Sequence, residues 1–448
     1  MASDAHTSAS GLSDRGGSAA SLFSSMAIWE VLQSLYDPAT NPGGYVSLGV
    51  AENTLLHDTL SEHIHSNISL TNHAFTYGEG PGGSKRLKES MSRFLTKHFK
   101  PVVPIKPSHI LVTNGCSGAI EHLSWVLANP GEGFLLGQPY YGAFPFDLKF
   151  RTGAKVIEVP FGKTDPLGLD AVAKYEAALL KAELEGTKIK GLVLCHPHNP
   201  LGRCYAPEVI VEIMKMCQKH DISLISDEIY GLSVWENTVD TPPTPVEFRS
   251  TLSINTEGVM DPSRLHVIWG MSKDFGANGI RIGSVISQHN PSLMSALGAV
   301  GLYSSASSIS EHVTANIFDD KAWTESYLAQ NRKLLSEQYA IAANWAKTNT
   351  IEYARGGNAA FFLWVDLGTA YRARHPDCKD EKVGDMVMKA LLKEKVFLAS
   401  GEGFGAEEDG WFRIVFSHPT VYLSEGLRRV LAALSTDQLS IQVEGLST

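Results

Sequence analysis

The sequence predicts an α/β protein: a large three-layer α/β/α domain built on a mostly parallel sheet, with a smaller α+β domain beside it. Short β-rich runs alternate with amphipathic helical stretches from about residue 108 to 290, a rhythm typical of a parallel sheet with helices on both faces. After residue 305 the alternation gives way to long helical segments with few strands. At 448 residues and 43% hydrophobic content, the chain is long enough for two or three structural units.

The individual elements follow from local patterns of apolar residues. β-rich runs predict strands of the large sheet at 109–113, 133–136, 155–159, 191–195, 222–226, 265–268 and 282–287. Helical spacing predicts helices at 117–128, 170–183 and 207–219. In the smaller domain, the patterns predict a helix at 321–347, a strand at 361–365, a helix near 381–394 and a strand at 412–416. Because ligands of such sheets bind at the carboxyl ends of the strands, residues that follow each strand are the candidates for a site.

The two ends of the chain differ in composition from its middle. The first 25 residues are rich in Ser, Ala and Gly and predict a disordered tail. Residues 26–50 are rich in loop-forming residues and predict an N-terminal arm that packs with the small domain or with a second subunit. We therefore expect a large domain over 51–305, a small domain over 306–435 and a C-terminal tail over 436–448.

Charge and cysteine content exclude several classes of function. The formal charge of −10 disfavours nucleic acid or an anionic membrane as the main partner. No apolar run approaches the roughly 20 residues that cross a bilayer. The five cysteines are scattered, without the spacing of a zinc site or a disulfide framework. We therefore expect a soluble protein of a reducing, cytoplasmic compartment.

Two turns of small or rigid residues follow predicted strands. The turn Thr113-Asn114-Gly115-Cys116-Ser117 opens a helix and exposes backbone N–H groups that suit a phosphate, although an ordinary capping serine is the alternative. Prolines in Cys195-His196-Pro197-His198-Asn199-Pro200 predict a rigid turn that presents Asn199 to a phenolic oxygen, or simply a structural turn. His196 and His198 suggest a metal, but no carboxylate or cysteine partner stands at a useful spacing.

Charged residues follow two further strands. In Ser226-Asp227-Glu228-Ile229-Tyr230, a buried Asp227 could keep a pyridine nitrogen protonated while Tyr230 donates to a ring oxygen; acidic capping of a helix is the alternative. Lys273 follows the strand at 265–268, with Arg281 eight residues later. A lysine at such a strand end can bond to an aldehyde cofactor while neighbouring donors hold its phosphate, whereas an isolated lysine is usually a solvated surface group.

These strings occur in one order, each at the end of a predicted strand, and together they resemble the fold-type I pyridoxal-phosphate enzymes of the class I/II aminotransferase group over residues 45–420. The chain is most similar to the 1-aminocyclopropane-1-carboxylate synthase-like branch, through Leu48-Gly49-Val50-Ala51-Glu52-Asn53, Pro139-Tyr140-Tyr141 and Ser272-Lys273-Asp274-Phe275-Gly276. The resemblance implies an aspartate-aminotransferase-like fold, pyridoxal 5'-phosphate as cofactor, a small-molecule α-amino-acid substrate, and a homodimer with shared active sites.

The resemblance also implies a role for each matching residue. Lys273 would be the Schiff-base lysine, with Asp227 and Tyr230 as its catalytic partners at the pyridine nitrogen and the ring oxygen. The remaining expected contacts are Asn199 to the ring oxygen, Cys116, Ser117, Ser272 and Arg281 to the phosphate, Tyr141 stacked on the ring, Tyr77 to the phosphate of the neighbouring subunit, Arg413 to the substrate α-carboxylate, and Glu52 beside the substrate amino and cationic groups.

The same residues serve several reactions. We expect a synthase-like lyase that breaks a bond to sulfur, with S-adenosylmethionine as the expected substrate. An aminotransferase is the alternative, because one catalytic set supports both reactions. A carbon–sulfur lyase or γ-substitution enzyme of specialised metabolism is a third, favoured by an altered loop at 77–87 and by the histidine turn. Gly270 and Gly142 also stand where the group has serine and proline. A non-catalytic binding module is disfavoured because the full residue set is present.

Overall fold

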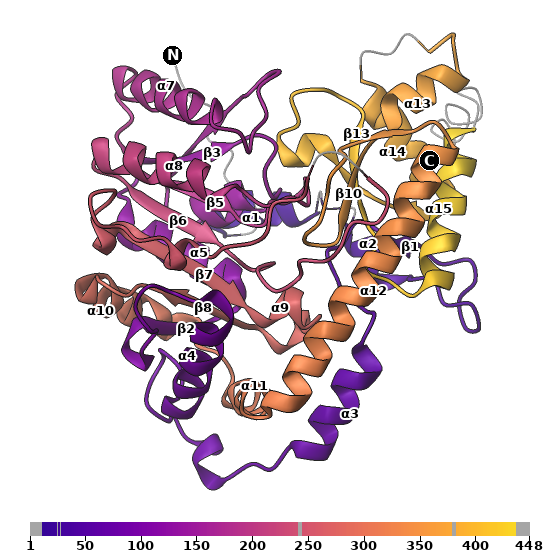
Figure 1. Ribbon diagram of the computed structural model, residues 1–448. Helices are drawn as coiled ribbons and strands as arrows, with labels where there is room; N and C mark the ends of the chain where they lie inside the picture. Colours follow the sequence, from indigo (N-terminus) through magenta and orange to yellow (C-terminus); the bar gives the residue numbers. More distant parts are fainter. Residues whose placement is uncertain (1–10, 25, 27, 241–243, 379–381, 436–448) are drawn as a thin grey trace.

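The computed structural model describes residues 11–24, 26, 28–240, 244–378 and 382–435. Its largest sheet has seven strands in the order β2-β8-β7-β6-β5-β3-β4 (Figure 1). Strand β8 runs antiparallel to both of its neighbours, and the other adjacent pairs are parallel. The strands are β2 (Ile110–Asn114), β3 (Gly133–Gly137), β4 (Lys155–Val159), β5 (Ile189–Cys195), β6 (Ser223–Asp227), β7 (Leu265–Gly270) and β8 (Ile282–Ile286).

Helices cover both faces of this sheet, because successive residues of a strand point to opposite sides. Val193 and Ile225 pack in one apolar cluster, whereas their neighbours Leu192 and Leu224 pack in another. The helices of this part of the chain are α3 (His57–Asn67), α4 (Lys85–Phe99), α5 (Gly115–Leu127), α6 (Phe144–Lys149), α7 (Ala171–Leu184), α8 (Pro207–Lys219), α9 (Met271–Asp274), α10 (Pro291–Val300) and α11 (Ser308–Asp319). The expected three-layer α/β/α architecture is therefore confirmed.

A second, four-stranded antiparallel sheet has the order β12-β13-β10-β9. Helix α12 (Lys321–Thr348) runs from the large sheet to this smaller one (Figure 1). Strand β1 (Val46–Ser47) pairs in parallel with β11 (Val396–Phe397), 350 residues further along the chain. The other elements are β9 (Glu352–Tyr353), β10 (Phe362–Asp366), β12 (Ala399–Ser400), β13 (Trp411–Val415), α2 (Ile28–Gln33), α13 (Leu367–Arg374), α14 (Val383–Lys393) and α15 (Thr420–Leu434).

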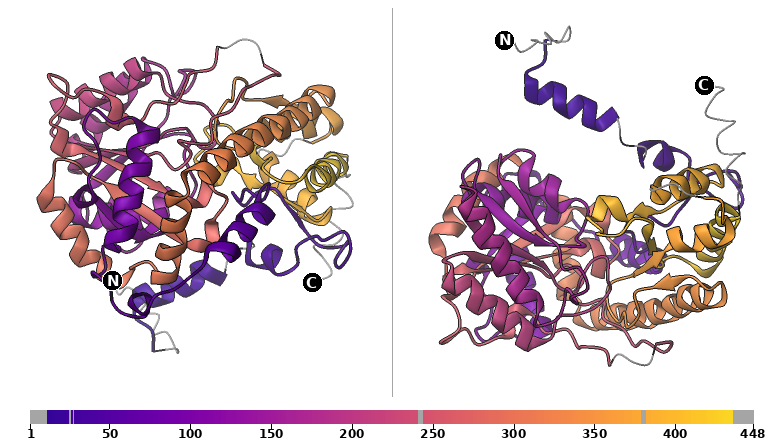
Figure 2. Two further views of the ribbon diagram at one scale, coloured as in Figure 1. Left: turned by 60° about the horizontal axis from the view of Figure 1, so that its bottom comes forward. Right: turned by 90° about the horizontal axis from the view of Figure 1, so that it is seen from above.

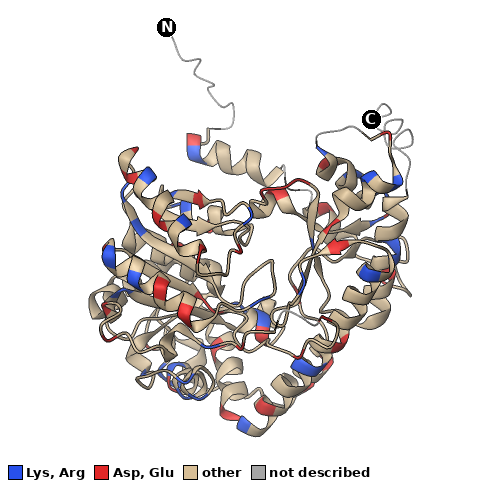
Figure 3. Cartoon of the chain, turned by 45° about the horizontal axis from the view of Figure 1, so that its top comes forward, with Lys and Arg blue, Asp and Glu red and all other residues tan. Residues whose placement is uncertain are grey.

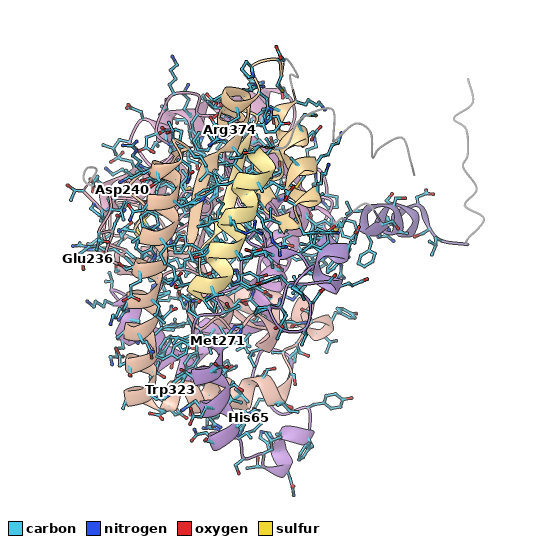
Figure 4. All side chains as sticks on the ribbon, turned by 90° about the vertical axis from the view of Figure 1, so that its right-hand side faces the viewer. His65, Glu236, Asp240, Met271, Trp323 and Arg374 are labelled. Carbon is cyan, nitrogen blue, oxygen red and sulfur yellow. The ribbon has the colours of Figure 1, made fainter. Side chains whose placement is uncertain are left out.

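A buried carboxylate joins α12 to the loop that follows β6. Asp240 lies beside α12 (Figure 4), where its two oxygens accept hydrogen bonds from Tyr339 Oη at 2.5 Å and from Tyr353 Oη at 2.7 Å. Lys347 Nζ adds an ion pair at 3.2 Å. These donors lower the pKa of Asp240 to about 2 against the opposing effect of burial. The contact ties the smaller sheet to the part of the chain that carries the large one.

The expected strands and helices agree with the observed ones to within one or two residues, but the expectation for the N-terminus does not hold. Residues Asp14–Ser24 form a helix, α1, where a disordered tail was expected. None of its residues is buried, and it lies apart from the rest of the chain (Figure 2). Residues 1–10 and 25 of the expected tail, and the expected C-terminal tail over 436–448, lie outside the described residues.

Charged residues of both signs are spread over the helices (Figure 3). None of the helices formed by the described residues is long and apolar enough to cross a membrane.

Candidate active site

The site forms where several strands of the large sheet end at one edge. Cys195 and Asp227, the last residues of β5 and β6, are paired neighbours, and β7 ends beside them at Gly270. Because β8 runs in the opposite direction, Arg281 enters the same edge just before its first residue. The ends of β5, β6 and β7 and the start of β8 therefore lie at one edge of the sheet, the edge at which ligands of such sheets bind.

Lys273 lies in the short helix α9 directly after β7, with its ammonium group facing the N-terminal segment. Its Nζ donates a hydrogen bond of 2.6 Å to the carbonyl oxygen of Ala51, which also accepts from Asn278 Nδ2 at 3.1 Å. Burial and the positive charge of Arg413 lower the pKa of Lys273 to about 8, and the Glu52 carboxylate opposes them. This lysine can therefore lose its proton close to neutral pH.

Asp227 is a nearly buried carboxylate at the end of β6, with 4% of its surface exposed. The Ile229 N–H donates to Oδ1 at 3.2 Å. Burial raises the pKa of Asp227 to about 7, and the neighbouring charge of Glu228 raises it further, whereas the Ile229 hydrogen bond and Lys273 lower it. A positive charge placed beside Asp227 would lower its pKa and stabilise the carboxylate form.

Arg413 projects from β13 into the same space and is 3% exposed. Its guanidinium lies between two rings, with Cζ 4.4 Å from the Phe362 centroid and 4.7 Å from that of Phe404. Nη1 donates to Asn199 Oδ1 at 3.0 Å and Nη2 donates to the Gly49 carbonyl at 2.7 Å. Among the described residues, Nε has no hydrogen-bond partner. The two rings and the two acceptors hold the Arg413 guanidinium in one plane, and the guanidinium still has N–H groups free to donate.

The turn between β2 and α5 forms the open end of the site. Gly115 has φ +75°, and a Cβ there would collide with the guanidinium of Arg281. Arg281 Nη1 donates to the Asn278 carbonyl at 2.9 Å, and Nη2 donates to the Asn114 carbonyl at 3.4 Å. Ser117, in the first turn of α5, and Arg281, just before β8, are both exposed. A glycine is required because the backbone and the arginine approach each other so closely.

Gly270 and Cys116 explain one departure from the family pattern. A Cβ on Gly270 would lie 2.6 Å from the Ile282 carbonyl oxygen and 2.9 Å from Cys116 Sγ. Burial raises the pKa of the Cys116 thiol, so it is a neutral packing group here. Ser272, 5% exposed, is the hydroxyl that remains next to Lys273. The serine expected at 270 has no room.

Two tyrosines line the interior of the site. Tyr230 is 2% exposed and packs edge-on against Phe361 and Phe362, at centroid distances of 5.5 and 5.3 Å. Burial raises the pKa of Tyr141 to about 12, with the nearby Asp147 carboxylate acting in the same direction. Both phenols therefore stay protonated and can donate a hydrogen bond at neutral pH.

Asp147, on α6, is a half-buried residue that the sequence did not single out. Its Oδ2 has no hydrogen-bond partner among the described residues, and burial raises its pKa to about 6 against a hydrogen bond from Ser117. Three other contributors were also missed: the carbonyl groups of Gly49 and Ala51, and the ring pair around Arg413. Backbone acceptors and core phenylalanines leave no mark in a sequence that distinguishes them from ordinary structure.

The remaining candidate residues fall into different places. Glu52 is half-buried and its charge acts on Lys273. Tyr77 is fully exposed in a separate cavity of about 680 Å³ and is not brought to the other site residues of its own chain. His196 and His198 are buried, and a ring nitrogen of each forms a hydrogen bond with a backbone group. His196 Nε2 lies 3.0 Å from the Arg249 carbonyl oxygen, and the Leu201 N–H donates to His198 Nδ1 at 3.4 Å.

Comparison with known proteins identifies the family. The family model described as aminotransferase class I and II matches residues 45–430. The chain is 34% identical over 408 residues to 1-aminocyclopropane-1-carboxylate synthase-like protein 1 of Bos taurus, covering 89% of this chain and 78% of the relative. It is 33% identical over 408 residues to a mouse (Mus musculus) protein described as a probable inactive 1-aminocyclopropane-1-carboxylate synthase-like protein 2, covering 89% and 67%.

The fold is also that of solved enzymes. Aspartate aminotransferase from Thermus thermophilus with maleate superposes with a TM-score of 0.72 at 20% identity, covering 95% of this chain and 99% of the other. This likeness concerns the fold alone. The family match spans both sheets and the strand-end residues described above. The chain belongs to the class I and II aminotransferases, a family of aspartate-aminotransferase-like fold whose cofactor is pyridoxal 5'-phosphate.

Proposed function

We propose that this chain is an active pyridoxal-phosphate enzyme that acts on an α-amino acid, and that it is a synthase-like lyase that cleaves a carbon–sulfur bond. The observation that carries the proposal is the grouping of Lys273, Asp227 and Arg413 at one sheet edge, each buried or half-buried. Two rings and two acceptors hold the Arg413 guanidinium in one plane, and Lys273 has a lowered pKa. Asp227 has a raised pKa and would be stabilised by a cationic partner. Non-catalytic proteins have no need of these three groups together.

The residues present fit the cofactor. Gly115 lets the Arg281 guanidinium lie against the turn at the start of α5, where a Cβ would collide with it, and the exposed side chains of Arg281 and Ser117 would supply donors to a phosphate there. Asp227 would pair with a protonated pyridine nitrogen, and Lys273 would hold the cofactor covalently. Tyr230 and Asn199 would donate to the ring oxygen, Tyr141 would stack on the ring, and Ser272 and Cys116 would line the phosphate end.

Pyridoxal phosphate supplies an electrophilic carbonyl carbon and an electron-withdrawing ring. The chain's own residues then bind, orient and move protons. Arg413 binds the substrate α-carboxylate through its free donor capacity, with Phe362 and Phe404 keeping water from its faces. Lys273 Nζ, neutral in part of the molecules near pH 8, removes the proton from Cα. Asp227 would hold a proton on the pyridine nitrogen and so would keep the ring a good electron acceptor.

Glu52 supports the lyase assignment over transamination. It lies in the Ala51-Glu52-Asn53 string, and its charge acts on Lys273, so it lies beside the place where Cα must be. A carboxylate there would attract a cationic sulfonium group such as that of S-adenosylmethionine. The similarity to a protein named synthase-like supports the same choice.

An aminotransferase is the second candidate. The same lysine, arginine and aspartate serve that reaction, and the matching family is described as aminotransferase class I and II. A carbon–sulfur lyase or γ-substitution enzyme of specialised metabolism is the third, favoured by the altered loop at 77–87 and by the histidine turn.

We further propose a homodimer in which Tyr77 of one subunit completes the phosphate site of the other. Tyr77 and Phe75 are exposed to 102% and 72%, an unusual position for two neighbouring large rings. Tyr77 lines the cavity that Leu302, 63% exposed, also lines. A second copy of the chain would bury these rings and bring a phenol to the open phosphate end.

One experiment separates these activities. The purified protein is incubated with S-adenosylmethionine, and separately with a panel of amino acids plus a keto acid, and the products are identified by mass spectrometry. Release of methylthioadenosine without a keto acid supports the lyase. A new keto acid together with pyridoxamine phosphate supports the aminotransferase instead. Lys273→Ala should abolish either product, whereas Lys174→Ala, an exposed lysine on α7, should not.

A further inference from the structure

A loop of the smaller sheet lies against the edge of the large sheet. The loop, residues 401–410, joins β12 to β13 and begins with a short 3₁₀ helix (Gly401–Phe404). Strand β4 stands last in the order of the large sheet, and the turn after it contains Phe161 and Gly162. Because β13 carries Arg413, this β12–β13 loop connects the strand of the arginine to the edge strand of the large sheet.

Glu407 crosses this contact with its carboxylate. Oε1 accepts hydrogen bonds from the Phe161 N–H at 2.7 Å and from the Gly162 N–H at 2.9 Å, and Oε2 accepts from the Gly162 N–H at 3.0 Å. Gly162 has φ +60°. Two successive backbone N–H groups that converge in a turn form a site for an anion. The carboxylate of Glu407 fills that site, so the smaller sheet is tied to the turn after β4.

The β12–β13 loop also lies against the turn that follows β3 and carries Tyr141. The Tyr140 N–H donates to the Phe404 carbonyl oxygen at 2.9 Å, and Tyr140 Oη donates to Glu158 Oε1 on β4 at 2.7 Å. Gly405 has φ +64°, and a Cβ there would lie 2.5 Å from Cε1 of the Tyr140 ring. Tyr140 is therefore held between the loop and β4.

Gly142 permits this close approach. A Cβ on Gly142 would lie 2.6 Å from the carbonyl oxygen of Gly403, a backbone atom that cannot turn away as a side chain can. Gly142 stands where the group that the chain resembles has proline. The glycine and the position of the loop therefore fit each other, and a residue with a Cβ at 142 would push the loop from the turn.

Phe404 connects the β12–β13 loop with the candidate active site. The residue is 5% exposed, and its ring centroid lies 4.7 Å from Cζ of Arg413 and 5.8 Å from the centroid of the Trp364 ring. An aromatic face against a guanidinium attracts the cation and keeps water from it. The place of this ring depends on the loop that carries it, and the Glu407 carboxylate holds that loop.

We propose that Glu407 is a positioning residue for substrate binding: by holding the β12–β13 loop on the large sheet, it keeps Phe404 against Arg413 and so raises the affinity for the substrate carboxylate. Glu407 is exposed and acts only through the loop. The proposal rests on the carboxylate role of Arg413 in the proposed function. Because the cofactor contacts come from the strand ends of the large sheet, loss of the Glu407 carboxylate should leave cofactor binding unchanged.

The first measurement follows the loop in the holoenzyme without any amino acid. The Tyr140 N–H reports the loop rather than Glu407 itself, because its acceptor is the Phe404 carbonyl oxygen. Its hydrogen exchange, read by peptide mass spectrometry, should be faster in Glu407→Ala than in wild type. Glu407→Gln should be intermediate, because its amide oxygen can still accept. Glu408→Ala, an exposed neighbour in the same loop, is the matched control and should exchange like wild type.

The second measurement compares two probes that displace Lys273 from the cofactor and change its absorbance. Aminooxyacetate carries a carboxylate for Arg413, whereas methoxyamine has none. Glu407→Ala should lower the rate constant for aminooxyacetate about two- to tenfold, the worth of one net hydrogen bond, and leave that for methoxyamine unchanged. Gly142→Ala should have the same effect, whereas Gly403→Ala, with open space around its Cβ, should have none.

Three results would overturn the proposal. One is exchange of the Tyr140 N–H that is no faster in Glu407→Ala than in Glu408→Ala. Another is faster exchange with an unchanged rate for aminooxyacetate, which would separate the loop from the arginine. The third is an equal fall for both probes, which would place the effect on the cofactor. A wild type that reacts with aminooxyacetate but forms neither methylthioadenosine nor a keto acid would refute the proposed activities alone, because neither probe requires turnover.

Discussion

The raised pKa of Asp227 predicts how the stability of the cofactor-free protein depends on pH. The carboxyl has an ordinary pKa of 3.8, and burial raises it to about 7 in the folded chain. Between these values the folded state binds a proton that the unfolded state has lost. The contribution is therefore fully present below about pH 4 and disappears as the pH rises toward 7, at up to about 1.4 kcal/mol for each pH unit. Over the whole interval the loss is about 4 kcal/mol at most.

Replacing Asp227 by Asn removes this ionisation while keeping the shape of the side chain. We expect wild type and Asp227→Asn without cofactor to have similar free energies of unfolding at pH 4, and the variant to be the more stable by about 1.6 kcal/mol at pH 5 and by up to about 4 kcal/mol at pH 8. Urea unfolding at pH 4, 5, 6, 7 and 8 measures the difference, with Asp58→Asn, an exposed carboxylate on α3, as the control. Equal pH slopes for wild type and Asp227→Asn would refute the reasoning.

Two further predictions concern the site. Arg413→Lys keeps the positive charge but loses the planar guanidinium between Phe362 and Phe404. The affinity for amino acids, measured from the absorbance of the bound cofactor, should therefore fall about 10- to 100-fold, which corresponds to the loss of one charge-assisted hydrogen bond. An unchanged affinity would argue against a role of Arg413 in binding the carboxylate. Gly270→Ser places a Cβ 2.6 Å from the Ile282 carbonyl oxygen and should lower the free energy of unfolding by about 1–3 kcal/mol, whereas Gly279→Ser, with open space around it, should have little effect.

Most of the fold was predictable because each strand is an apolar run bounded by turn residues. The strand of the sheet that was expected at 155–159, for instance, is β4 with those bounds. The prediction of a disordered tail failed at α1. A composition rich in Ser, Ala and Gly occurs both in disordered tails and in weak helices, and contacts with the rest of the chain decide between the two. Composition alone carries no such information.

The candidate site was predictable to the extent that side chains reveal it. Asp227 and Lys273 follow apolar strands, where a charge is conspicuous. The carbonyl of Ala51, which accepts from Lys273, belongs to every residue alike and so gives no signal. Phe404 resembles any core phenylalanine until the chain brings Arg413 against its ring. Asp147 lies on α6, away from any strand end, and its partial burial follows from packing that local sequence does not encode.

The contacts between the N-terminal segment and the end of the chain bear on how the protein is made. Gly49 accepts from Arg413, 364 residues later, and β1 has no partner until β11 exists. At a synthesis rate of roughly 5–20 residues per second, the segment around Gly49 waits about 20–70 s on the ribosome without its partners. Its apolar residues are open to chaperones during that interval. The amino-acid pocket therefore closes only after nearly the whole polypeptide has emerged, and a chain that stops before β13 has no Arg413 to close it.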